Sequence, residues 1–102
     1  MAGLEEMADI LVVEDKPSFG NMLKASLEDA AITVQLTKNG REALRLFKKE
    51  KFEIAIIDLR LPDIDGIDLL REFKKFDTDT KFLIMTAFGT IERAVEAMKL
   101  GA

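Results

Sequence analysis

One short apolar run near the middle of the chain, residues 54–57, constrains the fold more than any other stretch. Its sequence, Ile-Ala-Ile-Ile, is rich in β-branched side chains and contains no polar residue. Such a run is typical of a strand buried on both faces, as in a parallel sheet covered by helices. The run stops at Asp58, and a loop with Pro62, Asp65 and Gly66 follows before the next helical pattern.

A strand pattern followed by a helix pattern occurs four times along the chain. Strands are expected at residues 9–13, 32–37, 54–57 and 82–85, with helices beginning near Pro17, Asn39, Asp65 and Gly89. Strands that alternate with helices predict right-handed crossovers and a parallel sheet with helices on both faces. We therefore predict an α/β fold with a doubly wound parallel sheet of four strands and four helices.

The helical spacing of apolar residues also predicts which side chains face the core. In the first helix these are Phe19, Met22, Leu23, Ser26, Leu27 and Ala30; in the second, Ala43, Leu44 and Phe47; in the third, Ile67, Leu69, Leu70 and Phe73; in the fourth, Ile91, Ala94, Val95 and Met98. Ile32, Val34 and Leu36 alternate with Thr33, Gln35 and Thr37, which predicts a half-covered strand near a sheet edge.

Composition limits the kind of function. The 102 residues suffice for one small domain, and the net charge of −4 gives no reason to expect direct binding to nucleic acid or to an anionic membrane. The chain has neither Cys nor His, so a bound metal must be a hard cation with oxygen ligands. No apolar run approaches a membrane span and no secretory signal is recognisable, so we expect a cytoplasmic protein.

Polar side chains follow three of the expected strands directly. Glu14 and Asp15 end the first strand, Asp58 ends the third, and Thr86 ends the fourth. If the first and third strands are neighbours, these groups converge where open α/β sheets bind ligands. Converging carboxylates repel each other, and a divalent cation such as Mg²⁺ relieves that repulsion. A carboxylate can also be the nucleophile in phosphoryl transfer, so the pattern predicts Mg²⁺-assisted phosphorylation of Asp58.

Each of these residues also has a purely structural explanation when it is taken alone. An Asp after a strand is often a turn former or a helix cap, and acids before Pro17 favour the positive end of a helix dipole. Thr86 alone is more often structural, and Pro62 with Gly66 is ordinary loop chemistry. A functional site is favoured only because these polar residues occur together at the ends of three strands.

Three separated segments resemble the receiver domain of two-component response regulators. They are ILVVED at residues 10–15, IIDLRLPDIDG at residues 56–66, and MTAFGTIERAVEAMKLGA at residues 85–102. The last segment is most similar to receivers of the NtrC type, which are attached to sigma-54-dependent transcription activators. The resemblance implies a flavodoxin-like sheet with the strand order 2-1-3-4.

The resemblance also implies a role for each matching residue around the acceptor. Asp58 falls on the phospho-acceptor. Glu14 and Asp15 fall on the acidic pair, of which Asp15 ligates Mg²⁺ directly and Glu14 acts through water. The backbone carbonyl of Arg60 falls on the remaining protein ligand of the metal.

Two further positions belong to the switch that the resemblance implies. Thr86 falls on the hydroxyl that moves toward the phosphoryl group, and the Ala87 N–H lies beside it. The donor would be a phosphohistidine on a sensor histidine kinase. The output would be a partner or attached domain, such as a sigma-54-type ATPase with a DNA-binding domain, that is absent from this chain. Such a module is a regulator of transcription and not an enzyme in the ordinary sense.

The resemblance ends before the family pattern is complete. We expect a leader at residues 1–8 and a receiver domain at residues 9–102 that is C-terminally incomplete, without the family's fifth strand, fifth helix and phosphoryl-contacting Lys. Residues 82–85 would then form an exposed apolar edge strand, so we expect the chain to self-associate.

Three other classes of function compete with the phospho-acceptor. A pseudo-receiver, a protein-interaction module that never takes phosphate, is favoured by the absent Lys and disfavoured by the acidic residues. A phosphatase with an aspartyl phosphate needs a second acid two residues after the nucleophile, where this chain has Arg60. A flavin-binding module is disfavoured because the chain has neither Trp nor Tyr.

Overall fold

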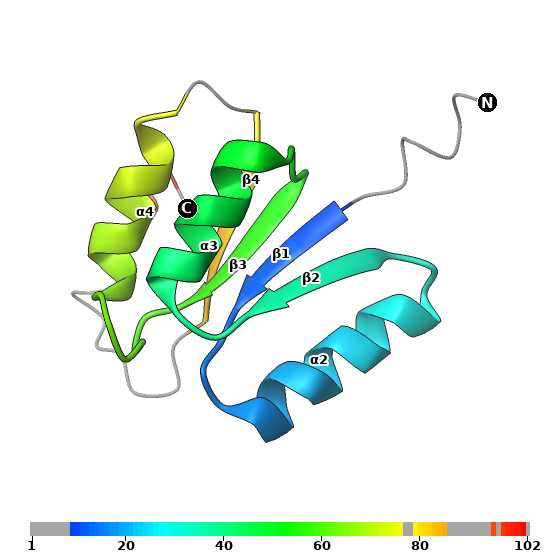
Figure 1. Cartoon of the computed structure of the whole chain (residues 1–102). Coiled ribbons are helices and arrows are strands. Elements are labelled where there is room, and N and C mark those ends of the chain that lie inside the picture. The colour runs from blue at the N-terminus through cyan, green and yellow to red at the C-terminus, as the bar shows by residue number, and fades with distance from the viewer. Residues whose placement is uncertain (1–8, 77–78, 86–94, 96, 102) are drawn as a thin grey trace.

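The computed structural model describes residues 9–76, 79–85, 95 and 97–101. Four parallel strands form one sheet in the order β2-β1-β3-β4 (Figure 1). The strands are β1 (Asp9–Val13), β2 (Thr33–Thr37), β3 (Ile54–Asp58) and β4 (Lys81–Met85), and the helices are α2 (Pro17–Asp29), α3 (Gly40–Lys49) and α4 (Gly66–Lys74). Val95 and residues 97–99 are also helical. The predicted fold class and strand order are confirmed.

The sheet separates two apolar layers. Leu11 and Val13 of β1 belong to the larger core cluster, which also contains the buried side chains of α3 and α4. Ile10 and Val12, which point to the other face, pack with side chains of α2 and β2. Figure 1 shows α2 on its own beside β2, whereas α3 and α4 lie next to each other, away from α2. In the described part of the chain no helix is long and apolar enough to cross a membrane.

Aromatic side chains fill the layer between the sheet and the helices α3 and α4. The rings of Phe47 and Phe73 lie 4.5 Å apart between centroids, and Phe73 and Phe82 lie 5.8 Å apart. Because these contacts join α3, α4 and β4, the aromatic residues form a structural core, as predicted.

The starts of α3 and α4 are fixed by side chains that the sequence predicted. Asn39 caps α3 by accepting a hydrogen bond from the Glu42 N–H at 2.8 Å. Asp65 caps α4 by accepting one from the Ile67 N–H at 2.8 Å. The second cap ends the loop that follows Asp58, so it helps to place that loop.

The predicted inward face of α2 is partly wrong. Leu23 and Leu27 pack on the sheet and Gly20 is buried, whereas four predicted inward residues are exposed: Phe19, Met22, Ser26 and Ala30. A Cβ at position 20 would lie 3.2 Å from a methyl group of Leu36. The missing side chain lets the helix approach β2 closely at Gly20, so this position, and not the neighbouring Phe19, faces the sheet.

Three further orientations differ from the prediction. Val95 and Met98 are 41% and 65% exposed, and the neighbouring Ala97 is buried in the core; the predicted inward residues Ile91 and Ala94 lie outside the described residues. Thr37 is buried, not outward, because its hydroxyl donates to the carbonyl of Val12 at 3.3 Å and so satisfies its polar group inside the protein.

Candidate functional site

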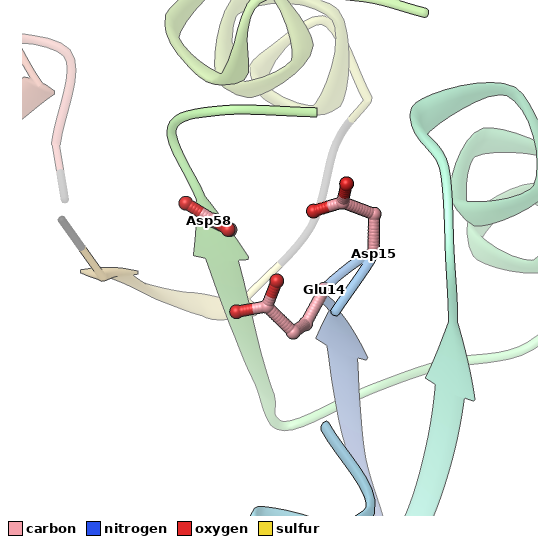
Figure 2. A group of neighbouring side chains, drawn as sticks. All are labelled: Glu14, Asp15 and Asp58. Carbon is pink, nitrogen blue, oxygen red and sulfur yellow. The ribbon is translucent and has the colours of Figure 1, made fainter. Parts of the chain in front are cut away.

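Two neighbouring strands bring the acidic residues together. Val13 of β1 lies opposite Ile57 of β3 in the parallel register, so the residues that follow, Glu14 and Asp58, lie side by side at the carboxyl ends of the two strands. Figure 2 shows Glu14 and Asp15 at the end of β1, Asp58 at the tip of β3, and the carboxylates gathered in the space between them. One oxygen from each of the three carboxylates lies within 4.8 Å of the others.

Backbone hydrogen bonds continue the sheet past the last strand residues and fix this end of it. The Glu14 N–H donates to the carbonyl of Thr37 at 3.0 Å, and the Leu59 N–H donates to that of Met85 at 3.2 Å. Glu14 and Asp58 are only 4% and 6% exposed. The two carboxylates are therefore close together and largely shielded from solvent.

This arrangement is electrostatically costly for Glu14. Burial raises the pKa of its carboxyl to about 7; a hydrogen bond from the Lys16 N–H opposes the shift, and the neighbouring Asp58 and Asp15 add to it. A carboxyl group with a pKa near neutrality, beside two other acids, is stabilised when either a proton or a bound cation offsets its charge.

The residues present fit a hard divalent cation. Asp15 is half-buried, and its Oδ1 is buried without a hydrogen-bond partner in the described part of the chain. An unsatisfied buried acceptor beside two acids is what a bound cation would satisfy. Since the chain has no His or Cys, all candidate ligands are oxygens, the donors that Mg²⁺ and Ca²⁺ prefer.

The loop after β3 is built closely around the acceptor candidate. Asp58 Oδ1 accepts a hydrogen bond from the Arg60 N–H at 3.0 Å, and the Gly66 N–H donates to the carbonyl of Leu59 at 3.0 Å. A Cβ at Gly66 would lie 2.5 Å from the Cα of Leu59 and 2.7 Å from the carbonyl oxygen of Asp58. Only glycine permits this approach of α4 to the end of β3, a requirement that the sequence did not reveal.

The predicted site residues thus fall into two groups. Glu14, Asp15 and Asp58 are brought together, and the backbone of Arg60 is next to Asp58. Thr86 and Ala87 lie outside the described residues. One participant was missed altogether: Asp63, whose carboxylate contacts the start of α3. An Asp directly after Pro62 carries no sequence signal that distinguishes this contact from an ordinary turn.

Comparison with known proteins assigns the family. The family model for the response regulator receiver domain matches residues 10–102. The chain belongs to this family. The Klebsiella oxytoca protein named transcriptional regulatory protein ZraR is 40% identical over 97 residues, which are 95% of this chain and 22% of that protein. The chain therefore spans about a fifth of the length of this curated relative.

Solved receiver structures share the fold. A CheY-like receiver domain protein from Methanospirillum hungatei has a TM-score of 0.90 at 28% identity, and the match covers 95% of this chain and 78% of that one. A response regulator from Burkholderia pseudomallei has a TM-score of 0.87 at 34% identity, with 93% of this chain and 56% of that one covered. That structure is described as containing a phosphorylated aspartic acid and a calcium ion. The predicted resemblance to receivers is confirmed.

Proposed function

We propose that this receiver accepts a phosphoryl group from a sensor histidine kinase on Asp58, with Mg²⁺ held by Glu14, Asp15, Asp58 and the carbonyl of Arg60. The observation that carries the proposal is the meeting of three carboxylates from two neighbouring strand ends within 4.8 Å. The buried, unpartnered Oδ1 of Asp15 supports a cation among them. The phosphorylated aspartic acid of the Burkholderia protein supports the same chemistry here.

In the proposed reaction, a carboxylate oxygen of Asp58 forms a bond to phosphorus. The phosphorus–nitrogen bond of the donor phosphohistidine breaks, and its electron pair stays with the imidazole. Bound Mg²⁺ would neutralise charge on the phosphoryl oxygens. The Arg60 N–H, which donates to Asp58 Oδ1, fixes the orientation of that carboxylate. The buried position of Asp58 limits access of water to the resulting acyl phosphate.

The proposed switch lies at the end of β4. We assign the switch hydroxyl to Thr86 and a phosphoryl-binding N–H to Ala87. Support comes from the sheet register, in which Met85, the last residue of β4, pairs with Asp58. Thr86 follows Met85 directly in the sequence, and this is the reason for assigning the switch to it.

The output of the module is proposed to be transcription. The similarity to ZraR, which is named a transcriptional regulatory protein, and the NtrC-like last segment support an output of the sigma-54 ATPase and DNA-binding type on a partner or attached domain. We also propose that the protein works in the cytoplasm, where it meets the sensor histidine kinase. This chain itself would contact neither nucleic acid nor membrane. The division into a leader at 1–8 and a receiver at 9–102 stays a prediction.

The test is the intact mass of the chain after incubation with acetyl phosphate and Mg²⁺. We expect one phosphoryl adduct that disappears when Mg²⁺ is chelated and is absent from the Asp58→Asn variant. Asp68→Asn is the matched control, because Asp68 is an exposed acid on α4 that is paired with Arg71 away from the site. An unmodified wild-type chain that still binds Mg²⁺ would instead support the pseudo-receiver.

A further inference from the structure

Asp63 joins the loop after the acceptor to a different element of the fold. Its Oδ1 accepts a hydrogen bond from the Gly40 N–H and its Oδ2 accepts one from the Arg41 N–H, both at 2.9 Å. Burial disfavours the charge of Asp63, but these backbone donors outweigh it and lower the pKa of the carboxyl group. The loop is thus bound by both oxygens of an ionised side chain to the start of α3.

Helix α3 already has a cap from its own sequence. Asn39 accepts from the Glu42 N–H at 2.8 Å, and Glu42 in turn accepts from the Lys38 N–H at 3.4 Å. The Asn39 side chain thus satisfies one N–H group of the helix start from the local sequence. Asp63 adds partners for two more, the N–H groups of Gly40 and Arg41, from a position more than twenty residues along the chain. The added contact restrains the loop as well as the helix.

Packing beside Asp63 reinforces the same junction. A Cβ at Gly40 would overlap Cγ2 of Ile64, so the Ile64 side chain sits directly on the first residue of α3. Two backbone hydrogen bonds tie this loop to its own ends: the Arg60 N–H donates to Asp58, and the Gly66 N–H donates to Leu59. Asp63 and Ile64 therefore attach the middle of the loop to the start of α3.

We propose that Asp63 is a positioning residue for the metal site: by holding the loop on α3, it fixes the backbone at Arg60 relative to Asp58. The part of the proposal that concerns the metal rests on the proposed function, in which the Arg60 carbonyl is a ligand. Residues that orient metal ligands from outside the ligand set commonly change metal affinity about 10-fold or more when they are removed.

The test compares Asp63→Ala with Asn39→Ala. Both variants remove hydrogen bonds from the same end of α3, but only Asp63 belongs to the acceptor loop. The first measurement is amide hydrogen exchange of Arg60 and Gly66 in the metal-free protein. The second is the dissociation constant for Mg²⁺ by calorimetry, because a chain without Trp or Tyr lacks a suitable intrinsic fluorophore.

We expect Asp63→Ala to accelerate exchange at both amides and to weaken Mg²⁺ binding about 10-fold. Asn39→Ala should leave the exchange rates of the two amides and the dissociation constant for Mg²⁺ close to the wild-type values, after correction of the exchange rates for any change in global stability. Asp63→Asn, which keeps one acceptor oxygen for one of the two N–H groups, should lie between wild type and Asp63→Ala.

Each other outcome has a distinct meaning. If Asp63→Ala and Asn39→Ala behave alike in both measurements, the positioning role is overturned, even where wild type binds Mg²⁺ well. If no variant binds Mg²⁺ but Asp63→Ala still accelerates exchange at Arg60 and Gly66, the proposed function fails while the positioning of the loop by Asp63 stands.

Discussion

At the scale of single residues, the burial of Glu14 makes its ionised form unfavourable in the folded metal-free protein. Glu14 is buried beside Asp58, and the pKa of its carboxyl is raised from about 4.5 to about 7. The folded metal-free protein therefore binds this proton more tightly than the unfolded chain does. A residue selected for packing alone would not be a buried acid next to another one.

The stability of the metal-free protein should consequently depend on pH through Glu14. Its folded pKa is raised, so the contribution of Glu14 to the free energy of unfolding is fully present below about pH 4.5 and is lost as the pH rises to about 7. Urea unfolding of wild type and Glu14→Gln across this range measures the effect. In Glu14→Gln, the part of the pH dependence of the free energy of unfolding that comes from Glu14 should be absent, and the part that comes from all other groups should remain. Parallel pH profiles for the two proteins would contradict the assignment.

At the scale of secondary structure elements, the sequence predicted well what local chemistry decides. The four apolar runs gave the strands, and Asn39 and Asp65 were correctly predicted as helix starts because capping depends on a few adjacent residues. The inward faces of helices were predicted less well. Gly20 looks neutral in an apolar pattern, yet its lack of a side chain decides how α2 lies on β2.

The candidate site was predictable to a similar extent. Its three carboxylates follow strands that the topology places side by side, so strand ends and strand order sufficed. Gly66 and Asp63 could not be recognised, because their roles depend on contacts with Leu59 and with the start of α3 that exist only in the folded chain.

The end of α2 provides a prediction at this scale. Ala31, just after the helix, has φ +64°, a left-handed conformation that suits glycine. Ala31→Gly should raise the free energy of unfolding by about 0.5–1 kcal/mol, because relief of strain exceeds the added entropy of the unfolded chain. Urea unfolding measures this change. As a control, Ala30→Gly, at a position with φ −91°, should destabilise the protein; equal effects at both positions would contradict the argument.

At the scale of the whole molecule, one sheet edge carries an exposed apolar side chain. Leu83 of β4 is 51% exposed, and within the described residues β4 pairs with β3 alone. A strand with unpaired backbone groups and an apolar outer face favours pairing with another chain. This observation supports the self-association expected from the sequence.

The self-association can be tested through that side chain. Light scattering of the 102-residue chain at high concentration should show a species larger than the monomer, and Leu83→Glu should shift it toward the monomer. Met22→Glu is the matched control, since Met22 is 53% exposed but lies on α2. A monomeric wild type at high concentration would contradict the expectation, as would equal effects of the two variants.

The claim on which the whole account rests is that Glu14, Asp15 and Asp58 form one divalent cation site. Calorimetric titration of the chain with Mg²⁺ tests this claim most directly. We predict one bound ion per chain at neutral pH, with binding abolished or strongly weakened by Asp15→Asn and unchanged by Asp68→Asn. Binding that survives Asp15→Asn, or the absence of binding by wild type, would contradict it.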